Sequence, residues 1–278
     1  MSGKSADLGE AAYRIRKSVL ETCLRAGTGH LTSSLSCIDI LVALYHGRLL
    51  RFDPRHPAWE KRDRFIMSKG QASPALYAVL ADLGFFDPRH LELFAREGGR
   101  MGVHLQKDVP GVEITSGSLG HGLGIAAGLA LGAAMNGEAH RVFVLLGDGE
   151  CDEGSVWEAA MFAAHHQFGN LTAIIDRNGL CVTDFTERIV ALEPLEEKWK
   201  AFGWEVRRTD GHSHAALATA LADRGTPTSS PPLMVIADTV KGAGIPCISN
   251  IPFWHGQVPS GELADRCRTE LAQRYGRG

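Results

Sequence analysis

The sequence lacks the features that mark nucleic-acid-binding and membrane-spanning proteins. Its 29 Lys and Arg residues are balanced by 32 Asp and Glu, which leaves a formal net charge of −3 over 278 residues. A basic surface for a phosphate backbone is therefore absent. No apolar run approaches the roughly 18–20 residues that cross a bilayer, and residues 1–17 are polar where a signal peptide would be apolar. These absences predict a cytoplasmic protein with no nucleic-acid or membrane partner.

Paired cysteines are missing as well. The six cysteines lie far apart in the sequence, and no two of them have CxxC spacing. This spacing argues against a structural zinc site and against a disulfide framework, so we expect reduced thiols. Glycine, by contrast, is abundant: it makes up 32 of the 278 residues, against roughly 7% in an average protein. The glycines bunch in a few places, which in a globular enzyme indicates backbone held close to a ligand.

The order of apolar segments predicts one α/β domain over residues 1–278, with a doubly wound, mostly parallel sheet and helices on both faces. Five short buried strands are expected, at residues 64–67, 142–146, 171–175, 205–208 and 233–237. A turn and a helix follow each of them except the last strand. Peripheral N-terminal helices are expected within about residues 7–47, the second of them at 36–46, and a C-terminal helix at about 261–275.

Two polar side chains follow neighbouring strands of this predicted sheet. Asp148 lies in a Gly-Asp-Gly turn after the strand at 142–146, and Asn178 follows the strand at 171–175. The carboxyl ends of parallel strands meet at one edge, where ligands of such sheets bind. A carboxylate and an amide oxygen suit Mg²⁺, which completes its shell with phosphate oxygens and water. The combination predicts a seat for Mg²⁺ and a diphosphate, although Asp148 alone could simply cap the next helix.

A dinucleotide site is a competing interpretation of the glycines at 122, 124 and 128. Such a site needs a strand directly before the glycines and an acidic residue about twenty positions later. The preceding strand is too short and Glu138 comes too early. A nicotinamide or flavin enzyme is therefore disfavoured.

The Gly-Asp-Gly turn followed thirty residues after Asp148 by Asn178 is similar to the thiamine-diphosphate motif. More widely, the sequence resembles the N-terminal, pyrophosphate-binding half of transketolases, and especially the split transketolases whose halves are separate chains. The matching stretches, in family order, are Gly29-His30, Lys69-Gly70 with Ala72-Ser-Pro-Ala-Leu-Tyr77, His104, Val112-Glu-Ile-Thr-Ser-Gly-Ser-Leu-Gly-His-Gly122, Gly147-Asp-Gly149 with Glu153-Gly154, Asp176-Arg-Asn178, Asp210-Gly-His212, Lys241-Gly-Ala-Gly244 and Trp254-His-Gly256.

The resemblance implies a role for several of these residues. It gives Asp148, Asn178 and the backbone carbonyl of Leu180 to the metal. It places three histidines around the thiazolium and the sugar as catalytic residues: His30, His104 and His255. The residues that it places against the cofactor are Gly117, Leu119, Gly149, Asn178, His255, Gln71 and Glu153. Glu153 and Glu158 fall where the family has acidic residues that link paired active sites, and His121 could serve either packing or cofactor contact.

Gln71 departs from the family, which commonly has histidine at this position. An amide can hydrogen-bond a phosphate or hydroxyl, but it cannot carry a proton near neutral pH. This departure bears on the substrate more than on the cofactor.

The resemblance also implies a partner. In transketolases a glutamate from a second domain activates the cofactor, and only a short helix follows the last motif here. We therefore expect a separate C-terminal subunit that carries the pyrimidine domain and this glutamate, in an α2β2 assembly.

The expected reaction is the transfer of a two-carbon ketol unit from a ketose or ketose phosphate to an aldehyde acceptor, with thiamine diphosphate and Mg²⁺ as cofactors. One alternative is the α subunit of a 2-oxoacid dehydrogenase or of another thiamine-diphosphate enzyme that forms carbon–carbon bonds. A second alternative is a cofactor-free scaffold of the same fold. His30, His104 and His255 favour the transketolase type over the first, and the intact pair of Asp148 and Asn178 opposes the second.

Overall fold

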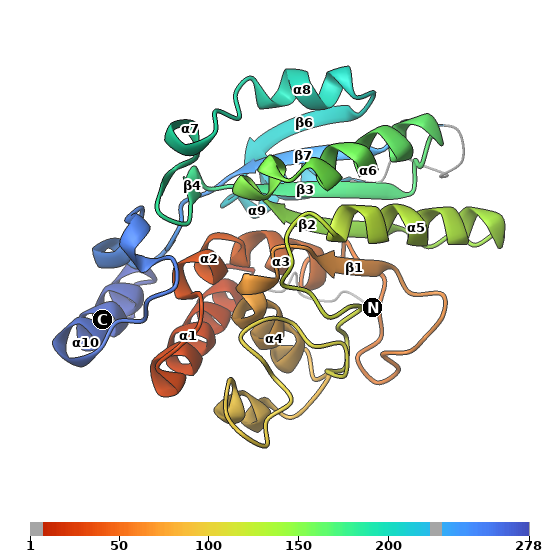
Figure 1. Cartoon of the computed structure of the whole chain (residues 1–278). Coiled ribbons are helices and arrows are strands. Elements are labelled where there is room, and N and C mark those ends of the chain that lie inside the picture. Colours follow the sequence, from red (N-terminus) through yellow and green to blue (C-terminus); the bar gives the residue numbers. More distant parts are fainter. Residues whose placement is uncertain (1–7, 223–229, 278) are drawn as a thin grey trace.

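A parallel sheet of five strands forms the centre of the computed structural model, which describes residues 8–222 and 230–277 (Figure 1). The strands lie in the order β1-β2-β3-β7-β6. Their bounds are Arg64–Met67 for β1, Val142–Gly147 for β2, Leu171–Arg177 for β3, Glu205–Asp210 for β6 and Leu233–Asp238 for β7. The chain winds from β1 to β3, crosses to the edge at β6 and returns to β7, so the winding reverses between β3 and β7. The predicted doubly wound α/β fold is confirmed.

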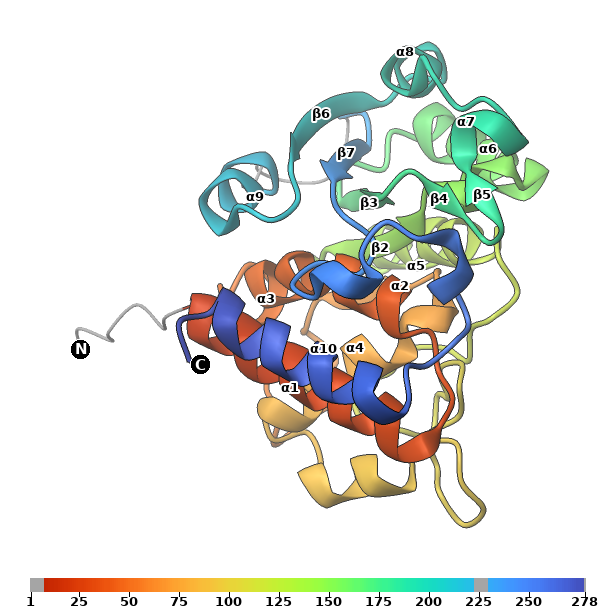
Figure 2. The ribbon, with the colours of Figure 1, turned by 90° about the vertical axis from the view of Figure 1, so that its left-hand side faces the viewer.

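Helices cover both faces of the sheet because the strands are apolar on both faces. In β2, Phe143 and Leu145 pack into the core on one side, whereas Val142, Val144 and Leu146 pack into the core on the other. Figure 2 shows the two helical layers from the side.

The first layer consists of α1 (Leu8–Ala26), α2 (Leu31–Ser36), α3 (Ile38–Tyr45), α4 (Ser73–Asp82), α9 (His214–Ala220) and α10 (Gly261–Arg274). The second consists of α5 (Gly122–Met135), α6 (Gly154–His165) and α8 (Leu195–Ala201). A small hairpin, β4 (Leu180–Cys181) and β5 (Asp184–Phe185), leads from β3 into α7 (Thr186–Ile189).

Helix α2 is a correction to the sequence prediction, which placed one helix at 36–46. Helix α3 lies within this predicted range, whereas α2 precedes it and ends at Ser36, before Cys37; every residue of α2 and α3 is buried rather than peripheral. The serines and threonine of α2 are poor helix formers, so local propensity does not indicate a helix. Three of the four hydroxyls have partners: Thr32 donates to the carbonyl of Trp254 at 2.8 Å, Ser34 to that of His30 at 3.0 Å, and Ser36 to the carboxylate of Asp176 at 2.6 Å. The buried hydroxyl of Ser33 has no partner among the described residues.

Helix α5 begins so close to β1 that only glycine fits at its first position. A Cβ on Gly122 would lie 2.3 Å from Oγ of Ser68, and the backbone N–H of Gly122 donates to that oxygen at 3.1 Å. The glycine-rich segment before α5 is thereby held against the end of β1, at the edge of the sheet where ligands are expected.

Helices α1 and α10 pack along each other and join the two ends of the described chain (Figure 2). Arg268 pairs with Glu21 across them, with 2.8 Å between Nε and Oε1. Helix α10 lies where the sequence predicts a C-terminal helix, and the helix start predicted at residue 7 lies outside the described residues. None of the helices in the described part of the chain is both long and apolar enough to cross a bilayer.

Candidate active site

A cavity of about 160 Å³ opens at the carboxyl ends of β1, β2 and β3, beside the segment that follows β7. Its walls include all the predicted site residues except one: His30, Gln71, His104, Gly117, Leu119, Asp148, Gly149, Asn178, Leu180 and His255. The exception is Glu153, which is exposed at the start of α6, as is Glu158 farther along that helix. His121 is exposed too, and its Nδ1 donates to the carbonyl of Leu119 at 3.0 Å.

The register of β2 and β3 brings Asp148 and Asn178 together. Gly147 pairs with Asp176 across the two parallel strands, so the residues that follow each strand leave the sheet side by side. Asp148 begins the short 3-10 turn at Gly149–Asp152, and Asn178 begins the turn into β4. The prediction that two neighbouring strands deliver these two side chains to one edge is confirmed.

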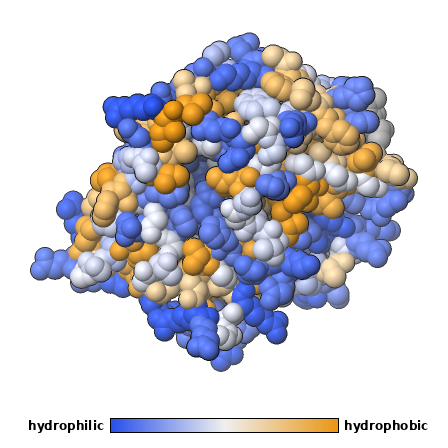
Figure 3. Space-filling view, in the orientation of Figure 1, coloured by the Kyte–Doolittle hydropathy of each residue, from blue (hydrophilic) through white to orange (hydrophobic). Residues whose placement is uncertain are grey.

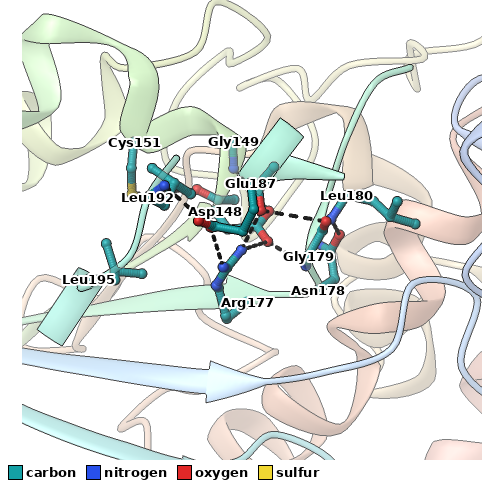
Figure 4. Close-up of polar contacts among 12 residues, drawn as sticks. Asp148, Gly149, Cys151, Arg177, Asn178, Gly179, Leu180, Glu187, Leu192 and Leu195 are labelled. Atoms are coloured by element: carbon teal, nitrogen blue, oxygen red, sulfur yellow. Dashed lines mark hydrogen bonds and ion pairs between the residues drawn. The ribbon is translucent and has the colours of Figure 1, made fainter. Parts of the chain in front are cut away.

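The carboxylate of Asp148 is buried and organises both strand ends (Figure 4). Its Oδ1 accepts from the backbone N–H of Gly149 at 2.9 Å, and its Oδ2 accepts from Gly179 at 2.6 Å and from Nη1 of Arg177 at 3.1 Å. Burial and the nearby charge of Asp176 nevertheless raise the pKa of Asp148 above its ordinary value. An additional cation at this position would stabilise the ionised carboxylate.

Three oxygen donors of different kinds lie at this point. They are the carboxylate of Asp148, Oδ1 of Asn178 and the carbonyl of Leu180. In the structure, Oδ1 of Asn178 accepts from the N–H of Leu180 at 3.2 Å, and the Leu180 carbonyl accepts from Nζ of Lys241 at 3.3 Å. The described residues contain no cluster of three or more His, Cys, Asp or Glu side chains that could bind a metal by themselves. One carboxylate, one amide and one carbonyl are hard ligands that fit Mg²⁺ only if a ligand such as a diphosphate completes the shell.

A buried ion pair lies directly behind these donors. Lys69, after β1, pairs with Asp176 at the end of β3, and both side chains are almost completely buried. Asp176 also accepts from the hydroxyls of Ser36 and Thr239, and Lys69 donates to the carbonyl of Ser33 at 3.0 Å. Although burial opposes ionisation, the charge of Lys69 and these hydrogen bonds lower the pKa of Asp176. The pair ties the ends of β1, β3 and β7 together beneath the cavity.

Glu150 is a second buried carboxylate at the cavity, and it joins three segments. It accepts from the hydroxyl of Ser68 after β1, from the N–H of Gly120 before α5 at 2.9 Å and from the N–H of Gly147 at 3.1 Å. Burial raises the pKa of Glu150 above its ordinary value. Its role is to hold the glycine-rich segment before α5 against the strand ends.

Three histidine rings cluster on the opposite wall. The centroid of the His30 ring lies 5.7 Å from that of His104 and 5.2 Å from that of His255. Burial and the neighbouring His104 lower the pKa of His30 to about 4, and burial and the charge of Lys241 lower that of His255 to about 3. Both rings are therefore neutral at neutral pH, each with one N–H donor and one bare nitrogen acceptor.

Lys241 supplies a positive charge between the histidines and the metal donors. Its Nζ lies 2.8 Å from Nδ1 of His255, and the same ammonium donates to the carbonyl of Leu180. Burial and the charge of Lys69 lower the pKa of Lys241 to about 8. A cationic group in this position suits an anionic ligand in the cavity.

Four residues that shape the site have no role in the sequence prediction: Lys69, Glu150, Asp176 and Lys241. Three of them lie in stretches that carry the family resemblance, and Glu150 directly follows the Gly-Asp-Gly turn. The sequence does contain one signal for these residues, because each is a charged residue near the end of an apolar strand. Nothing local shows that these four side chains are buried.

Residues 9–275 match the family described as "Transketolase, thiamine diphosphate binding domain". The chain belongs to the transketolase family. It is 40% identical over 245 residues to the 6-deoxy-6-sulfo-D-fructose transketolase subunit SqwG of Clostridium sp. (strain MSTE9), which covers 88% of each chain. It is 37% identical to an apulose-4-phosphate transketolase subunit of Phocaeicola vulgatus, covering 93% of this chain and 92% of that one.

Single-chain transketolases match along part of their length only. The human transketolase is 35% identical over 265 residues, which cover 95% of this chain and 42% of that protein. The crystal structure of the transketolase from Campylobacter jejuni superposes with a TM-score of 0.88 at 28% identity, covering 97% of this chain and 42% of that one. The predicted membership of the transketolase family is confirmed by the family match, and relatives that are covered along most of their length are named as transketolase subunits.

Proposed function

We propose that this transketolase subunit binds thiamine diphosphate with Mg²⁺ and, with a separate C-terminal subunit, transfers a two-carbon ketol unit from a ketose to an aldehyde. The observation that carries the proposal is the shared cavity of Asp148, Asn178 and three histidines. The two sets of residues come from segments far apart in the sequence. A scaffold has no use for this combination, and the family match favours the transketolase reaction over that of a 2-oxoacid dehydrogenase.

The residues of the cavity suggest how the cofactor is held. Asp148, Asn178 and the carbonyl of Leu180 would bind Mg²⁺, and the Lys241 ammonium supports an anionic diphosphate beside them. We assign Gly149, Gln71 and His255 to the diphosphate side, and the backbone of Gly117 and Leu119 to the remainder of the cofactor. Glu153 is exposed and does not line the cavity, so we assign it no contact with the cofactor within this chain. When bound, thiamine diphosphate supplies the electron sink for breaking and forming the carbon–carbon bond.

The histidines would move the protons of the sugar hydroxyls. A neutral imidazole can take a proton at its bare nitrogen and return one later, and such assistance is worth roughly 10²–10⁴ in rate. His30 meets this requirement because burial keeps it neutral, whereas Nδ1 of His255 faces the Lys241 ammonium at 2.8 Å, so His255 can only donate the proton on its Nε2. Nδ1 of His30 is buried and has no hydrogen-bond partner within the described part of the chain, so a substrate hydroxyl that reached it would supply the missing partner. His104 completes the wall that faces both rings.

An apolar face on α5 and α6 supports an oligomer. Ile125, Met135, Met161 and Phe162 are exposed there, and Met135 is exposed by 77%. Figure 3 shows hydrophobic atoms gathered over this part of the molecule. On α5, a Cβ added to Gly128 or Gly132 would meet no other atom within 4 Å, so another backbone can approach closely. We propose that this face packs against other subunits in an α2β2 assembly, and that the protein works in the cytoplasm.

The substrate proposal is a ketose with an anionic end. Both subunit-sized relatives are named for such sugars, one sulfonated and one phosphorylated. A donor panel should therefore contain ketose phosphates, a sulfonated ketose and an uncharged ketose, each offered with several aldehyde acceptors.

Mixing the purified chain with its partner tests the proposal. We expect no ketol transfer by either chain alone, and transfer that requires thiamine diphosphate and Mg²⁺ when both are present. Light scattering on the mixture should report two copies of each chain. Robust ketol transfer by the rigorously purified single chain would contradict the two-subunit arrangement, and decarboxylation of a 2-oxoacid without ketol transfer would contradict the reaction.

A further inference from the structure

The Asp-Gly-His sequence at residues 210–212 lies outside the cavity, yet it forms a specific turn at the end of β6. Oδ1 of Asp210 accepts from the backbone N–H of His212 at 2.8 Å. Gly211 donates to the carbonyl of Asp238 at 2.8 Å, and a Cβ on Gly211 would lie 2.9 Å from that oxygen and 2.5 Å from the side chain of Thr239. Only glycine lets this turn lie so close to the end of β7.

The turn aims the ring of His212 at two partners. Nδ1 lies 2.7 Å from Oδ2 of Asp39, and Nε2 accepts from the backbone N–H of Val240 at 2.9 Å. A carboxylate only accepts and a backbone N–H only donates, so the ring is a neutral tautomer with its proton on Nδ1. Arg16 completes the chain of contacts through a buried ion pair with Asp39, at 2.6 Å between Nη2 and Oδ2. Val240 is thereby linked to the core of the first helical layer.

Val240 directly precedes Lys241, whose ammonium contacts His255 and the carbonyl of Leu180 in the cavity. The N–H of Thr239, the residue before Val240, donates to the carbonyl of Arg177 at 3.0 Å. The N–H of Val240 has an acceptor of a different kind, a side chain from another element. Figure 2 shows β6 and α9 beside β7, with α9 above α3.

We infer that His212 is a positioning residue: it ties the backbone of Val240 to the Asp39–Arg16 pair and so fixes the place of Lys241 in the active site. The inference rests on the proposed function, because its effect is expected on cofactor binding. His212 itself does not line the cavity. If the hydrogen bond to the N–H of Val240 is lost, Lys241 keeps its charge but its backbone and side chain become more mobile. A mobile ammonium binds an anionic cofactor less tightly than one held in place.

His214 provides a matched control. Its Nε2 lies 3.2 Å from Oδ1 of the same Asp39 carboxylate, so it belongs to the same cluster. Among the described residues, its buried Nε2 has no hydrogen-bond partner in the segment from Thr239 to Gly242. A substitution at His214 therefore disturbs the cluster without touching the backbone that carries Lys241.

The test compares His212→Asn, His212→Gln and His214→Gln in the complex with the partner subunit. Asparagine keeps a donor for Asp39 but is too short to reach Val240, whereas glutamine places an amide oxygen at the reach of Nε2. Calorimetry gives the Kd of thiamine diphosphate, steady-state kinetics separates kcat from KM, and thermal unfolding gives Tm.

We expect His212→Asn to weaken cofactor binding roughly tenfold, because it leaves a backbone N–H without an acceptor. His212→Gln should restore most of the affinity, and His214→Gln should bind like the wild type. A His212→Asn complex with wild-type Kd overturns the inference, as does an equal loss of affinity in His214→Gln. If His212→Asn folds poorly, a well-folded His212→Gln complex with no better affinity overturns it instead. Failure of the proposed function is distinct, since the wild-type complex would then neither bind thiamine diphosphate nor transfer ketol units.

Discussion

The ammonium of Lys241 lies 2.8 Å from Nδ1 of His255, so the protonation state of each group depends on that of the other. Burial and the charge of Lys241 lower the pKa of His255 to about 3, whereas Lys241 itself keeps a pKa of about 8. At neutral pH the amine is therefore the charged partner, and it donates to the bare Nδ1. His255 must then carry its own proton on Nε2, and this fixes which of its nitrogens can donate to a ligand.

Replacement of Lys241 by Met should raise the pKa of His255. The substitution removes a nearby positive charge but leaves the ring buried, so the pKa should rise yet stay below the ordinary value of 6.5. Lys241→Arg, which keeps the charge, is the control. The measurement is an NMR titration of the histidine ring protons in the cofactor-free chain. An unchanged pKa in Lys241→Met would show that burial alone lowers it.

Asp148→Ala should weaken Mg²⁺-dependent binding of thiamine diphosphate by roughly a hundredfold or more. The substitution removes the only carboxylate from the proposed set of metal ligands. The fold should persist, since Arg177 keeps its ion pairs with Glu187 and Glu193 and the repulsion with Asp176 disappears.

Calorimetry with and without Mg²⁺ measures this effect, and circular dichroism checks the fold. Asp152→Ala removes an exposed carboxylate from the same short turn and should leave the affinity unchanged. An unaltered affinity in Asp148→Ala would falsify the metal assignment.

Gln71→His should change the preference among donors and acceptors while leaving cofactor affinity within a few-fold. Gln71 lines the cavity, and an imidazole and an amide can each donate one hydrogen bond at similar reach. Only the imidazole can also carry a proton near neutral pH, so a substrate that needs this proton transfer should gain in kcat/KM. The measurement is kcat/KM for several ketoses and aldehydes with wild-type and variant complexes. An identical order of preference would mean that Gln71 has no part in specificity.

The lowered pKa of His30 predicts that acid destabilises the fold. The ring has a pKa of about 4 in the folded chain, below its ordinary value of 6.5, because of burial and the neighbouring His104. Between these values the unfolded state binds the proton and the folded state does not. The free energy of unfolding should therefore fall as the pH drops from about 6.5 to about 4, and this contribution should be constant below that range.

Urea unfolding of the purified chain at about pH 7, 5.5 and 4.5 checks this expectation, with all histidine variants measured under the same conditions. His30→Gln should show a shallower loss of stability over this range than the wild type. His165→Gln, which replaces an exposed histidine on α6, should behave like the wild type. If the His30→Gln and wild-type curves are parallel, the ring is not kept neutral by the fold.

The positions of the strands and of Asp148 and Asn178, the two proposed metal ligands, follow from the order of residues along the chain. The apolar run at 142–146 ends in Gly-Asp-Gly and the run at 171–175 ends in Asp-Arg-Asn, and parallel strands deliver such ends to one edge. The length of an apolar run and the glycine turn that ends it are local properties of the sequence. They are sufficient to predict these two strands and the polar residues that follow them. The histidines are different, because His30, His104 and His255 lie in loops without a periodic pattern. Only the family resemblance could place them in the site.

The burial of charge could be seen only in the folded molecule. Lys69 and Asp176 are more than a hundred residues apart, and either one buried alone would be strongly unfavourable. Glu150 and His212 likewise depend on acceptors or donors from other elements, and in α2 the hydroxyls of Thr32 and Ser36 bond to distant segments that helix propensity does not anticipate. A buried polar group is stable only when its partners are in place, and those partners come from distant parts of the chain. Long-range packing therefore decided which charged residues form the floor of the site.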